Sequence, residues 1–238
     1  MFQMAVDASD FLRRSGEFMQ RQLPQIEVWA LNKTGDDALS ALQDRMKVSF
    51  DRPTRWTLNA FQVWRATKST RLAMVQERPS VGRRHYLKVQ ESGGPRQQTA
   101  LEKLIEARVV SAEILRAVVP TRDARVDSYG NWSRGERNQA LSEIGAQRDR
   151  AANATETSIK RARRRGRSSY FVPRNGGLTP GIWKRTVGGD LSKVATFAKR
   201  APLYAPRLKF EDTVAATYRD RLEPNLKWAF ERAVQTMR

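Results

Sequence analysis

Hydrophobic positions near both ends of the chain recur at spacings of three and four, which is typical of amphipathic helices. The first such segment covers about residues 7–46, and Pro24 suits its first turn. Its apolar positions are Ile26, Trp29, Ala30, Ala38, Ala41, Leu42 and Met46. Gly35 weakens this pattern without breaking it, since a glycine lowers helix propensity by only about 1 kcal/mol.

The C-terminal pattern predicts a second long helix over residues 210–237. Its apolar row is Val214, Tyr218, Leu222, Leu226, Phe230, Val234 and Met237. Pro224 lies inside this helix and should kink or divide it, because proline lacks the backbone N–H that an interior helical bond requires.

Alternating patterns between the two helices predict short strands. Residues 61–66 and 72–77 form one expected pair, joined by a polar turn at 67–70, and a third strand is expected at 85–91. Three further strands are expected at 169–172, 181–186 and 194–199.

The middle of the chain reads as helical. A helix is expected at 99–115, followed by a loop at 119–132. A second helix is expected to open with a capping box, in which Ser133 and Glu136 bond each other's backbone, and to run to about residue 150. Residues 151–168 contain few apolar side chains, which predicts an exposed and flexible arm.

These elements predict an α+β fold. We expect a small antiparallel sheet, built from strands near 61–77 and 169–199, against which the N- and C-terminal helices pack. The core domain would then comprise residues 1–91 and 169–238. A helical insertion, residues 92–168, would carry the flexible arm at about 151–168.

The net charge of the chain indicates what kind of partner it binds. The 238 residues include 44 Lys and Arg against 25 Asp and Glu, a formal net charge of +19. Such an excess favours a polyanionic neighbour, which would be nucleic acid, an acidic protein surface or anionic lipid. The chain has no cysteine, so disulfides and cysteine-ligated zinc are excluded. It shows neither a membrane-spanning apolar run nor a secretory leader, and we expect no membrane partner.

Enzymatic signatures are weak. His85 is the only histidine, no nucleophile elbow accompanies it, and a structural or surface role is favoured. Glycine pairs at 93–94, 176–177 and 188–189 match no phosphate-binding motif. A carboxylate-held metal, as in two-metal nucleases, would have to use scattered acids, namely Asp36, Asp37, Asp123, Asp127, Glu211 and Asp212. We expect no enzyme, no metal and no cofactor.

The stretch SIKRARRRGRSSYFVP, residues 158–173, is the densest positive segment. Its cations are Lys160, Arg161, Arg163, Arg164, Arg165 and Arg167. They would bind phosphates without sequence preference or act as a clamp on another subunit. The aromatics behind them would stack on bases or, as we favour, enter a core or subunit interface. The candidate interface residues are Trp132, Tyr170, Phe171, Trp183 and Tyr204.

Several short motifs, in order, resemble the minor tail protein Z group and the broader tail-completion proteins of tailed bacteriophages. They are WALNKT (29–34), FDRPTRWTL (50–58), YGNWSRG (129–135), the basic arm, YFV (170–172), PGIW (180–183), APLYAPR (201–207) and RDRL (219–222). The present chain is longer than the compact tail-completion domains, largely through residues 92–168.

The resemblance implies a structural virion protein that is assembled in the host cytoplasm and lies in the tail or neck. Such a protein would form a homo-oligomeric ring, with six copies expected, around the DNA channel. Its partners would be the tail tube or its terminator, the connector and the genomic DNA. Two alternatives remain: a sequence-nonspecific nucleic-acid-binding protein of phage or prophage origin, and a metal-dependent nuclease.

Overall fold

The computed structural model describes residues 22–82, 87–174 and 177–236, together with Arg13, Ser15, Gly16, Phe18 and Gln20. The chain forms two compact units, and its class is α+β, as predicted. Unit 1 comprises residues 1–91 and 206–238, and unit 2 comprises residues 92–205. His85 and the first part of the strand expected at 85–91 lie outside the described residues.

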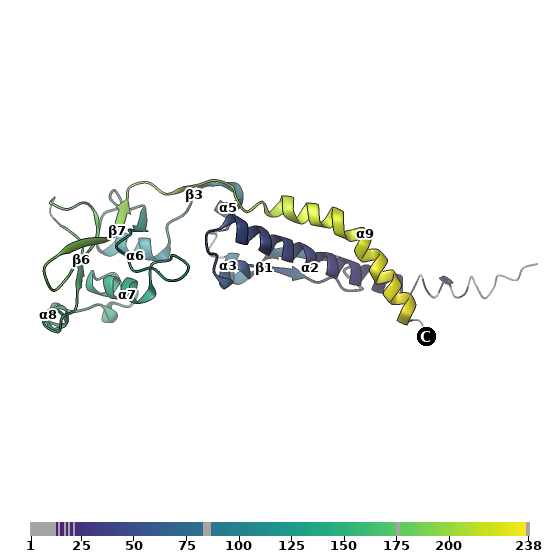
Figure 1. Cartoon of the computed structure of the whole chain (residues 1–238), viewed down its shortest axis with the longest axis horizontal. Coiled ribbons are helices and arrows are strands. Elements are labelled where there is room, and N and C mark those ends of the chain that lie inside the picture. Colours follow the sequence, from purple (N-terminus) through teal and green to yellow (C-terminus); the bar gives the residue numbers. More distant parts are fainter. Residues whose placement is uncertain are drawn as a thin grey trace, which may run out of the picture. The chain divides into compact units, whose positions relative to one another are not determined.

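Unit 1 is built on two long helices that lie side by side, α2 (Leu23–Ser49) and α9 (Phe210–Thr236) (Figure 1). They run antiparallel, since Ile26 and Ala30 near the start of α2 pack with Ala229 and Ala233 near the end of α9. Pro24 occupies the first turn of α2, as expected. The α9 helix continues through Pro224 and is not divided there.

A hairpin packs closely against α2. Strands β1 (Phe61–Trp64) and β2 (Met74–Glu77) pair antiparallel, as the alternating pattern predicted. A Cβ atom at Gly35 would lie 2.8 Å from Cγ1 of Val63, a separation that real side chains do not adopt. Gly35 is therefore the residue that allows β1 to approach α2.

The short elements of unit 1 are α3 (Arg55–Leu58), α4 (Pro79–Gly82) and α5 (Lys88–Ser92). Residues 88–91 are therefore helical, and the strand expected there is wrong. The ring of Phe61 stacks on Phe210 with centroids 5.1 Å apart, at the start of α9. Leu42, Met46, Leu87 and Leu208 are buried in the same cluster.

Unit 2 contains a four-stranded antiparallel sheet in the order β4-β7-β6-β5. These strands are β4 (Ala117–Pro120), β5 (Ser169–Phe171), β6 (Gly181–Arg185) and β7 (Leu191–Ala198). A two-stranded sheet joins β3 (Gly94–Pro95) to β8 (Leu203–Tyr204). The helices are α6 (Ala100–Arg108), α7 (Arg134–Glu143), the 3-10 turn η1 (Arg150–Ala152) and α8 (Glu156–Arg164).

The core of unit 2 joins the sheet to α6 and α7. Ile105 of α6, Leu141 of α7 and Ile182 of β6 are buried in one apolar cluster with Val194 and Phe197 of β7. The three strands predicted near 169–199 are therefore confirmed, but the prediction that they share a sheet with the strands near 61–77 is wrong. They pair with β4 instead of joining β1 and β2 in one sheet. The second unit accordingly ends at residue 205, whereas the insertion was expected to end at 168.

Two helix predictions in unit 2 differ from the structure. The helix expected at 99–115 ends at Arg108, and β4 occupies part of the expected 119–132 loop. The helix expected to run to about residue 150 ends at Glu143, and the Ser133 side chain makes no capping bond. The Glu136 carboxylate is buried and has other partners, so the predicted capping box is absent.

Candidate polyanion-binding and assembly surfaces

The basic segment folds as a helix instead of the flexible arm that its composition predicts. Thr155 caps α8 by accepting a hydrogen bond from Ser158 N at 3.2 Å. Ile159 and Ala162, three positions apart, are the half-buried residues of this helix. Gly166, with φ +78°, follows the helix end in the left-handed region that glycine adopts easily. Capping and this narrow apolar contact with the unit offset the high charge of α8.

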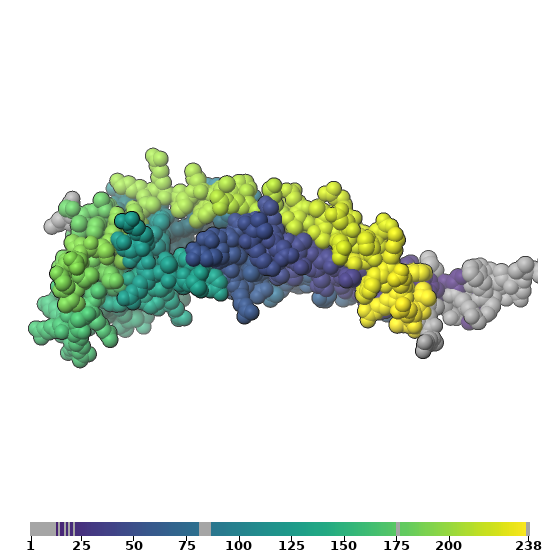
Figure 2. Space-filling view, viewed as in Figure 1, coloured from purple at the N-terminus to yellow at the C-terminus, as the bar shows by residue number. Residues whose placement is uncertain are grey.

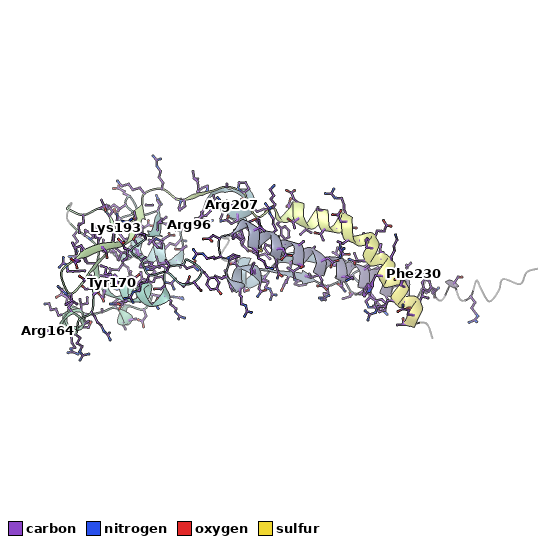
Figure 3. The ribbon with its side chains drawn as sticks, in the orientation of Figure 1. Arg96, Arg164, Tyr170, Lys193, Arg207 and Phe230 are labelled. Carbon is purple, nitrogen blue, oxygen red and sulfur yellow. The ribbon has the colours of Figure 1, made fainter. Side chains whose placement is uncertain are left out.

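All six predicted cations are exposed on or directly after α8. None of them forms an ion pair with an acid in the described part of the chain. Arg161, Arg163 and Arg164 lie in the last turn, where the helix dipole favours positive charge, and Glu156 lies in the first. Arg164 lies at the surface of α8 in Figure 3. These side chains are available to an external anion.

The excess of positive charge is greatest in the unit that carries α8. Residues 92–205 contain 22 Lys and Arg against 10 Asp and Glu, so they hold +12 of the net +19. Partly buried sites in this unit use some of the cations. The α8 group does not take part in them, which makes it the clearest exposed cluster of cations among the described residues.

Two of the candidate interface aromatics are buried within unit 2. Trp132 is 7% exposed and Tyr170 6% exposed. Both donate to the buried carboxylate of Glu136, Trp132 from Nε1 to Oε2 at 3.0 Å and Tyr170 from its hydroxyl to Oε1 at 3.0 Å. Both side chains therefore lie in the core of unit 2, where their polar atoms have the hydrogen-bond partners that buried groups need.

Glu136 is the centre of this buried cluster. It also accepts a hydrogen bond from Arg125 N at 2.6 Å, and Lys184 Nζ lies 3.7 Å from Oε1. Burial raises the pKa of Tyr170, and the neighbouring Glu136 carboxylate raises it further. The cluster holds the 125–132 loop, α7, β5 and β6 together, and we assign it a structural role.

The other candidate aromatics are half-buried. Phe171 and Trp183 are register partners on β5 and β6. A guanidinium carbon of Arg185 lies 5.1 Å from the Phe171 ring centre, and Lys193 Nζ lies 5.7 Å from that of Trp183. Each ring thus already has a cation over it. Tyr204 is half-buried on β8, where it pairs with Gly94.

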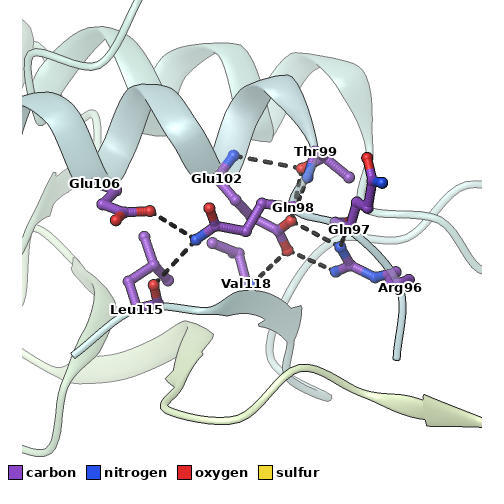
Figure 4. Close-up of polar contacts among 8 residues, drawn as sticks. All are labelled: Arg96, Gln97, Gln98, Thr99, Glu102, Glu106, Leu115 and Val118. Atoms are coloured by element: carbon purple, nitrogen blue, oxygen red, sulfur yellow. Dashed lines mark hydrogen bonds and ion pairs between the residues drawn. The ribbon is translucent and has the colours of Figure 1, made fainter. Parts of the chain in front are cut away.

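A second buried network, around Glu102, was missed by the sequence analysis. Arg96 donates from two guanidinium nitrogens to the two carboxylate oxygens at 2.5 and 2.7 Å (Figure 4). Thr99 N and Val118 N donate to the same carboxylate at 2.7 and 2.8 Å. Thr99 and Glu102 form a true capping box, and the spacing T-x-x-E could have revealed it.

The hydrogen bonds to Glu102 determine the direction of its pKa shift. Burial by itself would raise the pKa of Glu102, but the hydrogen bonds from Arg96, Thr99 and Val118 outweigh it and lower that pKa. The Glu102 side chain is only 2% exposed. The ion pair fixes the first turn of α6 to β4 and to the segment that follows β3.

On unit 1, the apolar row of α9 is not the face that packs on α2. The residues of α9 that are buried against α2 are Asn225, Ala229 and Ala233. Asn225 Nδ2 donates to Thr34 Oγ1 at 3.0 Å and to Asp37 Oδ2 at 2.9 Å. The predicted row, from Tyr218 to Val234, stays largely exposed. Figure 2 shows the yellow surface of α9 running beside the purple surface of α2.

Sites for small ligands are poorly developed. Among the described residues, no group of three or more His, Asp or Glu side chains is placed to hold a metal ion. An open hollow of about 440 Å³ in unit 2 is lined mainly by apolar residues, with Arg174 as its charged member. No helix within the described ranges is both long and apolar enough to cross a membrane.

Comparison with known proteins identifies no relative. No family model, no curated protein and no solved structure matches this chain.

Proposed function

We propose that this chain is a non-enzymatic structural virion protein of a tailed bacteriophage. It completes the tail or joins it to the head at the neck, as a subunit of a six-membered ring around the DNA channel. The observation that carries the proposal is α8, a folded helix whose exposed cations have no acidic partner in the described structure. A ring that encircles DNA, or rests on an acidic connector, would provide that partner.

Two other features support the proposal. The order of the short motifs resembles that of phage tail-completion proteins. Among the described residues, the strands at the edges of the four-stranded sheet, β4 and β5, each have one side without a partner strand. Such an edge can bind a strand of a neighbouring subunit.

A nonsense mutation in the coding sequence, carried by the phage that encodes this chain, tests the role in the virion. Electron microscopy of the lysate should show filled heads and tails that have not joined, or tails of abnormal length. Supplying the chain from a plasmid should restore joined particles. Infectious particles of normal form in the absence of the chain would refute the proposal.

Sequence-nonspecific nucleic-acid binding is a second candidate, favoured by the same α8 cations. On this alternative, the chain would bind duplex DNA with an affinity that falls steeply with salt. Replacing Arg161, Arg163, Arg164 and Arg165 by Ala should reduce the slope of log K against log salt by up to about 4, since each phosphate contact contributes about 0.9. An unchanged slope would exclude α8 as the DNA-binding surface.

A further inference from the structure

The exposed row of α9 contains large apolar side chains spaced four residues apart. Tyr218 is 50% exposed, Leu226 37%, Phe230 49% and Val234 51%, with Leu222 half-buried among them. Residues four apart follow one another along a ridge of the helix surface, so these side chains form one continuous strip. We call the residues 218, 222, 226, 230 and 234 the apolar strip.

A row of alternating charges runs beside the strip. Each of its members directly follows a strip residue, in the order Arg219, Glu223, Lys227 and Glu231. Within the helix, Lys227 Nζ lies 2.9 Å from Glu223 Oε1, and the two side chains are 71% and 77% exposed. The charges are therefore open to a second partner.

The opposite side of the helix carries one large aromatic side chain, which is 36% exposed and has cations beside its ring. Trp228 lies there, with Lys33 Nζ 5.2 Å and the guanidinium carbon of Arg232 5.4 Å from its ring centre. The Arg232 guanidinium also covers Trp29 at 4.8 Å. Cations thus cover the large aromatic on that side. In the strip, Phe230 has an edge contact with Phe18 at 5.7 Å and is still half-exposed.

We propose that the apolar strip of α9 binds the same strip of a second copy of this chain, with the two helices antiparallel about a twofold axis. In such a pair each row meets its own copy running the other way. If the twofold axis passes through the pair at the height of Pro224, Tyr218 lies opposite Phe230 of the second copy. Leu222 then lies opposite Leu226 of the second copy. Every strip residue from 218 to 230 then has an apolar partner.

The charges select this register. When Tyr218 meets Phe230, the residues that follow them, Arg219 and Glu231, also meet. When Leu222 meets Leu226, Glu223 meets Lys227 in the same way. Both pairs are of opposite sign, and the twofold axis repeats each of them. A shift by one helical turn, which places Lys227 opposite Lys227, would set like charges together.

Pro224 does not obstruct this contact. It lies two positions from both Leu222 and Leu226, and therefore about 200° around the helix from the strip. Large half-exposed side chains contribute on the order of 100 Å² each, so the strip would bury on the order of 400 Å² per copy. This is about half of what a standard stable interface buries, and it indicates reversible pairing.

The pairing is independent of the proposed ring, in which neighbours meet head to tail instead of about a twofold axis. Sedimentation of the full chain across a concentration series, at low salt and without DNA, measures it. We expect a monomer–dimer equilibrium, or pairing of larger assemblies. The K227E variant should dissociate at least 10-fold more readily, because it places like charges together twice in each pair.

The double variant E223K/K227E should restore association, since it exchanges the signs and keeps them complementary. L226R should abolish pairing, and V187R, which changes an exposed valine in unit 2, is the matched control and should not. A wild-type chain without twofold pairing at any concentration would overturn the proposal. So would association that K227E and L226R leave unchanged. A ring that persists in L226R after the twofold pairing is lost would leave the proposed function intact, whereas twofold pairing that persists in L226R would refute the strip alone.

Discussion

The hydroxyl of Tyr170 donates a hydrogen bond to Oε1 of Glu136, which is 34 residues away in sequence, at 3.0 Å. Tyr170 is on β5 and Glu136 is in the first turn of α7, so this bond links the sheet of unit 2 to the helix that covers it. The same carboxylate binds Trp132. Two aromatic residues that look available for assembly in the sequence are committed to the core by one glutamate.

Tyr170 should remain protonated at pH values where exposed tyrosines ionise. Burial, together with the Glu136 carboxylate, raises its pKa in the folded state. Its stabilising contribution is therefore complete below the unfolded-state pKa of about 10, and it is lost as the pH rises through the higher folded value. Absorbance at 295 nm, compared between the wild type and Y170F, should show the Tyr170 step at a higher pH than the ordinary tyrosine value of about 10. An early step would contradict the buried hydrogen bond.

The E102Q variant should be less stable by about 3 kcal/mol, because it leaves the Arg96 guanidinium without its charge partner in a mostly buried site. The pKa of Glu102 is lowered in the folded state, so its contribution is present above the unfolded-state value of about 4.3 and is lost as the pH falls through the folded one. E102Q should therefore also weaken the acid sensitivity of unit 2. Urea unfolding with hydrogen exchange resolved in residues 92–205 measures both effects.

The control for that experiment is D44N, which removes the ion pair between Asp44 and Lys47. Both of these side chains are more than half exposed. Its effect should stay below about 1 kcal/mol. Equal losses in the two variants would show that the Glu102 network is not a special source of stability.

Removing the N-cap of α8 should loosen that helix. T155A deletes the side-chain oxygen that accepts from Ser158 N, at a cost of about 1 kcal/mol. Amide exchange in residues 156–164 should accelerate about fivefold, with little change elsewhere. S133A is the matched control, since the Ser133 side chain caps nothing in α7. Rapid exchange of residues 156–164 in the wild type itself would support the flexible arm instead.

Gly181 should tolerate no side chain. A Cβ atom there would collide with the carbonyl oxygen of Ala195 on the paired strand and lie 2.9 Å from Cδ of Lys193. G181A should cost about 3 kcal/mol or prevent folding of unit 2. G135A has open space around its added methyl and should stabilise α7 by about 0.5–1 kcal/mol. Thermal unfolding of the two variants makes the comparison, and a G181A chain as stable as the wild type would contradict the β6–β7 packing.

Local periodicity located most of the secondary structure. The hairpin of β1 and β2, the strands β5, β6 and β7, and the long helices α2 and α9 all lie where alternation or a spacing of three to four placed them. These patterns are readable because side-chain direction repeats with the backbone geometry of each element. The prediction of a flexible arm at residues 151–168 is wrong because α8 depends on one N-cap and on two half-buried residues, Ile159 and Ala162.

The candidate surfaces also divide into features that neighbouring residues determine and features that depend on residues far apart in the chain. The positions of the α8 cations, and their exposure, were predictable from composition. The burial of Trp132 and Tyr170 was not predictable, because both side chains bind Glu136. From spacing alone, Glu136 is expected to be a helix-capping residue. The Glu102 network depends in part on Val118, 16 residues away, and no local pattern marks that contact.

The sequence by itself determined the α+β class, the periodic elements and the positive charge concentrated near residues 158–167, since each depends on residues close together in the chain. Only the tertiary structure decided which strands share a sheet, and which side of α9 faces α2. Asn225, Ala229 and Ala233 pack there because two hydrogen bonds and small side chains allow close approach of the helices, while the larger residues of the apolar strip stay outside. Such choices depend on burial and hydrogen bonding between segments far apart in sequence, which a local pattern does not encode.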